Sequence, residues 1–333
     1  MKGMILAAGL GSRLGTLTDE RPKPLIPVAD IPVIRYAVAL LAGAGITDIV
    51  INLFHLGDLI ERELGDGRAL GVNIVYSREA PAILGTGGGM KQALARGLLA
   101  PDEPFVVVNG KIVFDLDLPA VIAQHDRSGA LATLVVRPDP DARRWGAINT
   151  HAGRVVGILD HRAPDATTSA GVDHMFTGVH VVEPALLARL PDGEACILRQ
   201  GYIPALLAGV PLGAYVAAGY FHEHSTPARY LEGNLNILRG QVTLAHPPGP
   251  LIGVDPSASL NGADIVPPVR IGPGAHIAAG ARIGPDAVIG TNARVGPVRV
   301  ERAVVWPDAT VDRDAISTIV TPRTRVDVAV DGD

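Results

Sequence analysis

Residues suited to binding phosphate gather near the start of the chain. A short apolar run at 4–8 leads into Ala8-Gly9-Leu10-Gly11-Ser12-Arg13-Leu14, and glycines in such a loop let backbone N–H groups approach phosphate oxygens. Leu14 stands where a dinucleotide-binding fingerprint has its third glycine, and the Gly-Lys-Ser/Thr of a Walker loop is missing. By itself the Gly-x-Gly pattern is more typical of a structural turn than of a ligand site.

A lysine framed by prolines strengthens the case. Lys23 lies in Arg21-Pro22-Lys23-Pro24-Leu25-Ile26-Pro27, where the prolines restrict the backbone and hold the ammonium group in place. Only four of the 29 basic residues are lysines, so a lysine kept inside a motif is informative. Arg13 and Lys23 therefore predict two cations at an anionic ligand.

The stretch 6–28 closely resembles the signature of the sugar-1-phosphate nucleotidyltransferases. Three further segments match that family in order: Glu79 with 84–89, Val106-Val107-Val108-Asn109-Gly110, and Phe176-Thr177-Gly178-Val179 with Glu183. The chain is most similar to the members that act as mannose-1-phosphate guanylyltransferases or N-acetylmuramate-1-phosphate uridylyltransferases. The resemblance covers nearly the whole chain.

The resemblance implies that a sugar-1-phosphate oxygen attacks the α-phosphorus of a nucleoside triphosphate and that pyrophosphate leaves. That oxygen is already ionised near neutral pH, because the second pKa of a phosphate monoester is about 6, so no general base is needed. Catalysis is then positioning and neutralisation of charge, with Mg²⁺ as the expected cofactor. By resemblance the candidate residues are Arg13, Lys23 and Lys111 for catalysis; Ala8, Gly9, Gly11, Ser12, Glu79, Gly85, Thr86 and Gly87 for the nucleotide; Asn109, Gly146, Arg162, Thr177 and Glu183 for the sugar phosphate; and Glu223 for the metal.

The chain departs from the family at its metal site. Lys111 replaces an aspartate that binds Mg²⁺, and an ammonium group repels the ion rather than ligating it. Glu223, in Phe221-His222-Glu223-His224, takes the place of the second aspartate and is one methylene longer. Arg162 is the nearest match to the family's lysine on the sugar phosphate. Magnesium binding is therefore in doubt.

Several interpretations stay open. Lys111 supplies the charge that Mg²⁺ normally provides, or Asp115 or Asp117 serves as a substitute ligand. Alternatively, the chain is a regulatory homologue that binds a nucleotide sugar without turning it over, or Lys111 is an engineered substitution in an active enzyme. We expect nucleotide binding with little dependence on magnesium and slow turnover. His222 and His224 make only a weak transition-metal pair, and we expect them to be polar residues of a surface or pocket.

Alternating strand and helix patterns must position these residues. Apolar runs at 48–53, 72–76, 105–108, 131–136, 155–159, 177–182 and 213–217 predict strands, and helical periods at 34–44, 56–64 and 90–99 predict helices. The alternation predicts an α/β nucleotidyltransferase domain at 1–240 with a Rossmann-like, mostly parallel, mixed sheet.

A six-residue repeat follows a Pro/Gly-rich linker at 241–258. Aliphatic residues recur at Ile265, Ile271, Ile277, Ile283, Ile289 and Val295. This period predicts a left-handed parallel β-helix at 259–325, followed by a tail at 326–333. Because the transferase motifs all precede residue 235, we expect the β-helix to serve assembly of a homo-oligomer or regulation, and nucleotide binding to survive its removal.

Composition excludes several classes of protein. With 47% apolar and 19% charged residues the chain is not disordered, and a net charge of −5 without a basic run argues against nucleic acid as a partner. No apolar run approaches the roughly 18 residues of a membrane span. One cysteine, no signal peptide and no membrane segment favour the cytoplasm. The expected partners are a nucleoside triphosphate and a sugar-1-phosphate; glycines 87–89 favour uracil, whereas the β-helix favours guanine and a mannose-like sugar, to which we give slight preference.

Overall fold

The chain folds into two compact units. The computed structural model describes residues 1–166 and 171–329. Unit 1 combines Met1–Gly9, Ala37–Gly110 and Leu116–Gly219, and unit 2 combines Leu10–Tyr36, Lys111–Asp115 and the described residues from Tyr220 onward. The two units interleave along the chain, so they do not test the expected division of the sequence at 241–258, which stays a prediction.

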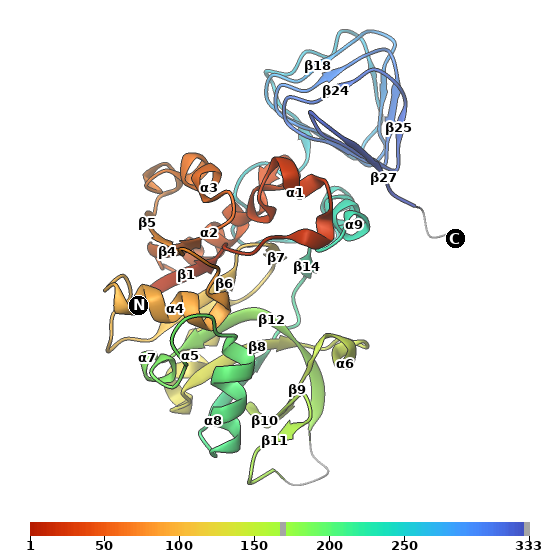
Figure 1. Ribbon diagram of the computed structural model, residues 1–333. Helices are drawn as coiled ribbons and strands as arrows, with labels where there is room; N and C mark the ends of the chain where they lie inside the picture. Colours follow the sequence, from red (N-terminus) through yellow and green to blue (C-terminus); the bar gives the residue numbers. More distant parts are fainter. Residues whose placement is uncertain (167–170, 330–333) are drawn as a thin grey trace. The chain divides into compact units, whose positions relative to one another are not determined.

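Unit 1 is built on a ten-stranded mixed sheet (Figure 1). Its order is β11-β10-β13-β8-β12-β6-β1-β4-β5, and β9 pairs with β10 and β12. The strands are β1 (Lys2–Leu6), β4 (Asp48–Leu53), β5 (Asn73–Arg78), β6 (Phe105–Asn109), β8 (Ala132–Arg137), β9 (Ala147–His151), β10 (Arg154–Ile158), β11 (His161–Arg162), β12 (Val172–Val182) and β13 (Leu212–Val216). Strands β6, β1, β4 and β5 run parallel, and β12 is antiparallel to both β6 and β8.

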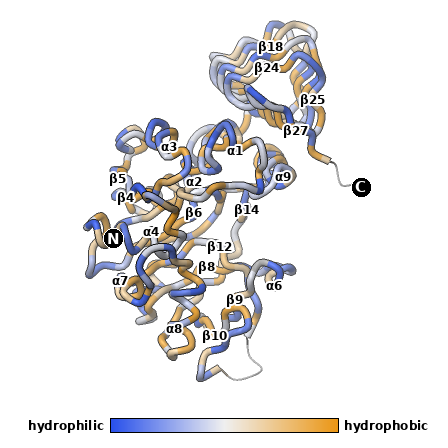
Figure 2. Tube along the Cα trace, viewed as in Figure 1, coloured by the Kyte–Doolittle hydropathy of each residue, from blue (hydrophilic) through white to orange (hydrophobic). Residues whose placement is uncertain are grey.

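Helices connect and cover these strands. They are α3 (Gly57–Leu64), η3 (Arg68–Leu70), α4 (Gly85–Ala95), α5 (Leu118–Ser128), α6 (Ala142–Trp145), α7 (Pro184–Leu187), the π-helical turn η4 (Ile197–Tyr202) and α8 (Ile203–Leu207). The predicted strands are confirmed because buried strands are continuous apolar runs, which Figure 2 shows as hydrophobic segments such as β6. The helix predicted at 90–99 begins earlier, at Gly85, because the glycine-rich stretch is itself helical.

The C-terminal part of unit 2 is a parallel β-helix, which confirms the predicted fold class. Its three sheets have the orders β15-β17-β20-β23-β26-β27, β16-β19-β22-β25 and β18-β21-β24. Their strands are β15 (Gly253–Val254), β16 (Asp264–Ile265), β17 (Val269–Ile271), β18 (His276–Ile277), β19 (Arg282–Ile283), β20 (Ala287–Ile289), β21 (Arg294–Val295), β22 (Arg299–Glu301), β23 (Ala303–Val305), β24 (Thr310–Val311), β25 (Ala315–Ile316), β26 (Thr318–Val320) and β27 (Arg325–Asp327). All pair in parallel except β27 with β26.

Strand pairing in the β-helix reproduces the repeat. Ile265 pairs with Ile283 eighteen residues on, whereas Ile289 pairs with Val305 after only sixteen, which is where the phase of the repeat slips. The aliphatic residues and the alanines fill the interior. Tight stacking of small and aliphatic side chains therefore accounts for both periodicities.

The rest of unit 2 is packed on one face of this β-helix. It comprises η1 (Ser12–Leu14), α1 (Leu17–Glu20), η2 (Lys23–Leu25), β2 (Pro27–Val28), β3 (Ile31–Pro32), the first turn of α2 (Val33–Gly43), β7 (Ile112–Phe114), β14 (Phe221–Glu223) and α9 (Pro227–Leu238). All of these elements except η2 and β14 contribute to one buried hydrophobic cluster with Val288, Val304, Trp306 and Ile319 of the β-helix. No helix within the described residues is long and apolar enough to cross a membrane.

Candidate active site

Three cations in unit 2 surround one carboxylate oxygen. Oε1 of Glu223 lies 2.9 Å from Nζ of Lys111, 3.2 Å from Nζ of Lys23 and 3.5 Å from Nη2 of Arg13. The structure thus brings together the three candidate catalytic residues and the candidate metal ligand. With three positive charges against one negative charge, the cluster is an attractive site for an anion.

A strand pair places Lys111 beside Glu223. β7 and β14 form a two-stranded antiparallel ribbon in which Ile112 is opposite Glu223, so the residue before Ile112 reaches the same carboxylate. The sequence predicts neither strand, because each has only three residues. Through this ribbon Lys111, which stands where the family has an aspartate, forms an ion pair with Glu223.

The phosphate loop reaches the cluster through Lys23 and Gly11. Lys23 begins η2 directly after Pro22, and only 6% of it is exposed. Gly11 has φ of +71°, and a Cβ there would lie 3.0 Å from both Lys23 Cβ and Thr18 Cγ2, so only glycine suits this approach. Ser12 begins η1, a 3₁₀ helix of three residues, which supplies far less dipole than a full α-helix would at this loop.

The cluster shifts two pKa values. Burial and the neighbouring Lys111 lower the pKa of Lys23 to about 8, against the opposing pull of Glu223. Burial acts to raise the pKa of Glu223, but the Lys111 and Lys23 ammonium groups outweigh it and bring that pKa down to about 2. Glu223 is therefore ionised at any physiological pH, while Lys23 loses its proton at mildly alkaline pH.

The donor set of this cluster does not fit Mg²⁺. Magnesium prefers oxygen ligands, and here the single carboxylate already faces three cations. Among the residues that the structure describes, no group of three His, Cys, Asp or Glu side chains is placed to hold a metal ion.

Neither substitute ligand joins Glu223 within its unit. Asp115 follows the far end of the ribbon, where its N–H donates to the Tyr220 carbonyl, about 13 Å along the strand from Lys111. Asp117 belongs to unit 1, where its carboxylate caps α5 by accepting from the Ala120 N–H at 3.0 Å. The hypothesis that Asp115 replaces the missing aspartate is therefore not supported, and the same hypothesis for Asp117 stays a prediction.

The β-helix holds the phosphate-loop segment in place. Asp30, in the β2–β3 turn, accepts hydrogen bonds from both the N–H and the hydroxyl of Thr291 at 2.9 Å. Trp306 is fully buried, donates to the Tyr230 hydroxyl at 2.9 Å and lies with its ring 5.7 Å from the Arg21 guanidinium. The expectation that the repeat serves assembly or regulation stays a prediction, and these contacts show that the β-helix also supports the segment that carries Lys23.

Sequence reasoning missed these anchors. Thr291 is some 260 positions from Asp30, so no local pattern links the two. One signal was present: Val288, Val304 and Ile319 occupy the outward position of their strands, where a solvent-facing coil would carry polar residues.

Unit 1 contains the other candidate nucleotide-binding residues. Glu79 accepts from the Leu84 N–H at 2.6 Å and from Asn52 Nδ2 at 2.7 Å, and Asn52 in turn accepts from the Ala7 N–H. Burial raises the pKa of Glu79, against these hydrogen bonds. Its carboxylate therefore braces the loop before α4 and the segment leading to Ala8 and Gly9.

The glycines of α4 serve close packing. The Ala195 carbonyl accepts from the N–H groups of Gly87 and Gly88, and the Thr86 hydroxyl accepts from the Ile197 N–H. Gly85 has φ of +68°, and a Cβ there would lie 2.8 Å from the Ala195 oxygen. A role for Gly85, Thr86 and Gly87 in binding the base stays a prediction, and packing explains these residue types without it.

Asn109 and Thr177 lie together at one edge of the sheet. Asn109 ends β6, and a Cβ on Gly178 would lie 1.9 Å from its Nδ2, so the glycine makes room for the amide. Thr177 is buried at a bulge of β12 and donates to the Val135 carbonyl at 2.7 Å. Only the Asn109 amide of this pair is partly exposed.

The structure does not bring Glu183 to that edge. β12 runs antiparallel to β6, with Val179 opposite Val108 and Val182 opposite Phe105. Glu183 therefore lies beyond the opposite end of β6 from Asn109, where its carboxylate approaches His125 at 3.3 Å. This register corrects the expectation that Glu183 and Asn109 line one sugar pocket.

Gly146 and Arg162 lie on the β9–β11 side of the sheet. Gly146 ends α6 with φ of +97°, and Arg162 is exposed on β11. Nearby, Asp173 accepts from Arg143 Nε at 2.8 Å and Asn149 Nδ2 at 2.9 Å, and these two partners lower its pKa. This polar group was not predicted, because its members come from three separate segments.

The histidines beside Glu223 are core residues. His222 and His224 are 4% and 0% exposed, their rings lie 4.9 Å apart, and His222 Nε2 lies 2.6 Å from the Arg229 carbonyl oxygen. The expectation of surface or pocket polarity is wrong, because α9 packs over both rings. A Cβ on Gly233 of α9 would lie 2.4 Å from His224 Nε2.

Comparison with known proteins identifies the family. Residues 2–161 match the nucleotidyl transferase family and residues 261–297 match the bacterial transferase hexapeptide repeats. A mannose-1-phosphate guanyltransferase of Schizosaccharomyces pombe is 30% identical over 270 residues, which cover 78% of this chain and 73% of that protein. The chain belongs to the sugar-1-phosphate nucleotidyltransferase family.

Two further matches name other sugars and bases. An N-acetylmuramate alpha-1-phosphate uridylyltransferase of Neisseria meningitidis is 52% identical over 120 residues, which cover 36% of this nucleotidyltransferase chain and about half (51%) of that protein. A Bacillus anthracis structure described as a glucose-1-phosphate thymidylyltransferase has 27% identity and a TM-score of 0.59, over 70% of this chain and 94% of that one. The named sugars and bases differ among these relatives, so family membership does not select a substrate.

Proposed function

We propose that the chain joins a hexose-1-phosphate to a nucleoside triphosphate, giving a nucleotide sugar and pyrophosphate, slowly and with little dependence on magnesium. The observation that carries this proposal is the cluster of Arg13, Lys23 and Lys111 around Glu223. Arg13 and Lys23 of this cluster lie in the segment that carries the family's signature, and the net positive charge of the cluster suits a triphosphate.

The chemistry requires charge neutralisation more than proton transfer. The sugar-phosphate oxygen forms a bond to the α-phosphorus, the bond from that phosphorus to the bridging oxygen breaks, and pyrophosphate carries away the electron pair. Lys23 would contact the α-phosphate and the sugar phosphate, and Arg13 would contact the leaving pyrophosphate. Lys111 would supply fixed positive charge, and no step depends on a metal ion.

Unit 1 carries the other residues that we propose for recognition. In unit 1, Asn109, Gly146, Thr177 and Arg162 remain the proposed sugar-phosphate residues, and α4 with Gly85 the proposed base-binding element. We favour a mannose-like sugar and guanine, because the Schizosaccharomyces pombe relative matches over most of both chains. The higher identity to the uridylyltransferase extends over only 36% of this chain.

A second candidate is a regulatory homologue that binds a nucleotide sugar without catalysis. The observation that favours it is that Glu223, the one carboxylate in the cluster, already has three cations around its Oε1 atom. Such a site retains affinity for phosphate while lacking the ion that speeds turnover. We also propose that the β-helix joins copies of the chain into a homo-oligomer, which light scattering at several concentrations would test.

One experiment separates the candidates. Melting temperatures measured with GTP, UTP, GDP-mannose and UDP-sugars, each with and without Mg²⁺, report binding, because a ligand of the native state raises the melting temperature. Pyrophosphate release with mannose-1-phosphate or N-acetylmuramate-1-phosphate then reports turnover. A transferase releases pyrophosphate above the level of a Lys23→Ala variant, whereas a regulatory homologue binds and releases none. Absence of any ligand-induced shift would contradict both proposals.

A further inference from the structure

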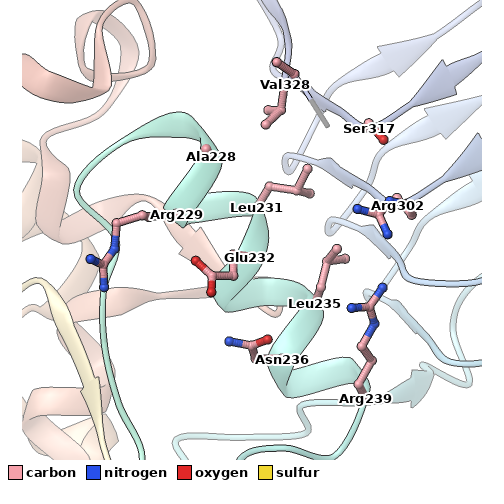
Figure 3. A pocket seen from close by; sticks show the side chains of 11 residues that line it. Ala228, Arg229, Leu231, Glu232, Leu235, Asn236, Arg239, Arg302, Ser317 and Val328 are labelled. Atoms are coloured by element: carbon pink, nitrogen blue, oxygen red, sulfur yellow. The ribbon is translucent and has the colours of Figure 1, made fainter. Parts of the chain in front are cut away.

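A groove lies beside the contact between α9 and the turns of the β-helix within unit 2. Its cavity has a volume of about 350 Å³, which suits a small organic ligand (Figure 3). Leu231, Leu235 and Arg239 of α9 line one side, and Arg302 and Ser317 of the β-helix line the other. Figure 3 shows the Arg239 and Arg302 side chains extending toward each other across this groove.

The β-helix side of the groove keeps side chains at strained backbone positions. Asp286, Arg302 and Ser317 occupy the same turn in three successive coils, directly before β20, β23 and β26, with φ of +63°, +48° and +50°. Elsewhere in the described β-helix, positive φ occurs only at glycine, asparagine and aspartate, the residues that tolerate it. Arg302 and Ser317 are the exceptions, and both line the groove.

Two arginines that line the groove each have an Nε atom without an acceptor. In the described part of the chain, Nε of Arg302 and Nε of Arg229 are buried without a hydrogen-bond partner. The Asp286 carboxylate accepts hydrogen bonds from Nε and Nη2 of Arg239, at 3.1 and 2.7 Å. Its negative charge is therefore used by Arg239 and does not neutralise Arg302. Glu232 is the one carboxylate among the lining residues, against three arginines. The Nε atom of Arg302 is out of reach of solvent, but Arg302 as a whole is only partly buried, so an anion entering the groove would contact the exposed part of its side chain.

We propose that this groove is a binding site for a phosphate monoester that carries an apolar group. The phosphate would bind Arg302, with Arg239 and the Ser317 hydroxyl beside it, because a guanidinium fork matches a phosphate oxygen pair. The apolar part would pack on Leu231 and Leu235. The site is separate from the Glu223 cluster. Helix α9 lines the groove and also packs against the histidines that neighbour Glu223.

The packing of α9 links the groove to that cluster. The Arg229 carbonyl oxygen accepts a hydrogen bond from His222 Nε2 at 2.6 Å. At Gly233, α9 lies so close to the ring of His224 that there is no room for a side chain. These two histidines flank Glu223 on β14. A ligand that holds α9 therefore also holds the strand that ends in the shared carboxylate, and the two anion sites should influence each other's affinity equally. This link, unlike the groove site itself, rests on the proposed function.

Phenyl phosphate and inorganic phosphate are suitable probes, used on the full chain carrying Lys23→Ala to weaken the first site. Titration is followed by the ¹⁵N–¹H signals of the arginine Nε–H groups. We expect the signal that is absent from an Arg302→Gln variant to shift, and phenyl phosphate to bind at least fivefold more tightly than phosphate because of the apolar wall. Phenol serves as the uncharged control.

Arg302→Gly separates binding from folding. Glycine relieves the positive φ, so this variant should melt at a higher temperature yet bind phenyl phosphate at least tenfold more weakly. Arg294→Gln, an exposed arginine on β21, should change neither property. An unmoved Arg302 signal, or unchanged affinity in Arg302→Gly, would overturn the site. If phenyl phosphate binds but leaves the pyrophosphate affinity of the unaltered chain unchanged, the link to Glu223 is overturned while the groove site and the proposed function both stand.

Discussion

Replacing Lys111 by aspartate should create a magnesium site. Nζ of Lys111 lies 2.9 Å from Glu223 Oε1, and Mg²⁺ on that oxygen would be about 2.1 Å away, so ion and ammonium would be at most about 5 Å apart. At an effective dielectric constant of about 20, a divalent and a unit charge at that separation repel by roughly 6 to 7 kcal/mol. Because 31% of the Lys111 side chain is exposed, screening and movement reduce this to about 3 kcal/mol.

About 3 kcal/mol corresponds to roughly 100-fold in affinity. Lys111→Asp should therefore bind Mg²⁺ at least about 100-fold more tightly than the unaltered chain and release pyrophosphate faster when Mg²⁺ is present. Isothermal titration with MgCl₂, at fixed GTP or UTP and constant ionic strength, measures the first effect. A coupled pyrophosphate assay with the matching sugar-1-phosphate measures the second.

Two variants act as controls for this prediction. Lys111→Met removes the charge without adding a ligand and should give an intermediate affinity. Lys91→Asp changes the charge equally at a half-buried position on α4, where Lys91 pairs with Asp192, and should have no effect on Mg²⁺ at Glu223. Equal Mg²⁺ affinity in the unaltered chain and in Lys111→Asp would refute the reasoning, because the ammonium group would then not govern the metal.

Three other predictions use the same unit. Pyrophosphate affinity should fall as pH rises through about 8, where Lys23 loses its proton, and Lys23→Arg should flatten this profile. The folded state holds this proton less tightly than the unfolded chain, so the free energy of unfolding should rise between pH 8 and about 10.5. Chemical denaturation at each pH measures that change. Gly11→Ala should destabilise the fold by about 1–2 kcal/mol and weaken pyrophosphate binding, whereas Gly15→Ala, at φ of +58° with open space around it, should cost stability alone; equal binding losses would contradict this. Removing the β-helix after Pro250 should abolish pyrophosphate binding, and a truncated chain that still binds would show that the β-helix does not support the loop.

The parts of the fold that depend on local pattern were predictable from sequence. Residues 48–53 and 105–108 are continuous apolar runs because both faces of those strands are buried, and the six-residue repeat follows from the coil itself. Lys23 was recognisable because prolines frame it. Arg13, Lys23 and Glu223 meet as expected, although they come from distant positions in the chain.

The rest of the site depends on register and distant packing. Whether Glu183 shares an edge with Asn109 is decided by the direction of β12, which a short motif does not reveal. Likewise, glycine at Gly87 suits both a ligand and a close neighbour, and packing against the Ala195 carbonyl is enough to account for the glycine without deciding whether a ligand binds there. The ribbon that pairs Lys111 with Glu223 is too short to carry a pattern of its own.

The outward residues of the β-helix carry the clearest overlooked information. In β20, β23 and β26 the first and third residues face the interior, so the middle residue must face outward, and it is Val288, Val304 or Ile319 in turn. Three aliphatic residues stacked on the outside of successive coils would be exposed unless another element covered them. In unit 2 that cover is α9 together with the phosphate-loop segment, which share their hydrophobic cluster. Departure from polar residues on the outer face of a repeat therefore marks where the rest of the chain must pack, and here it indicates that the platform for Lys23 is the β-helix.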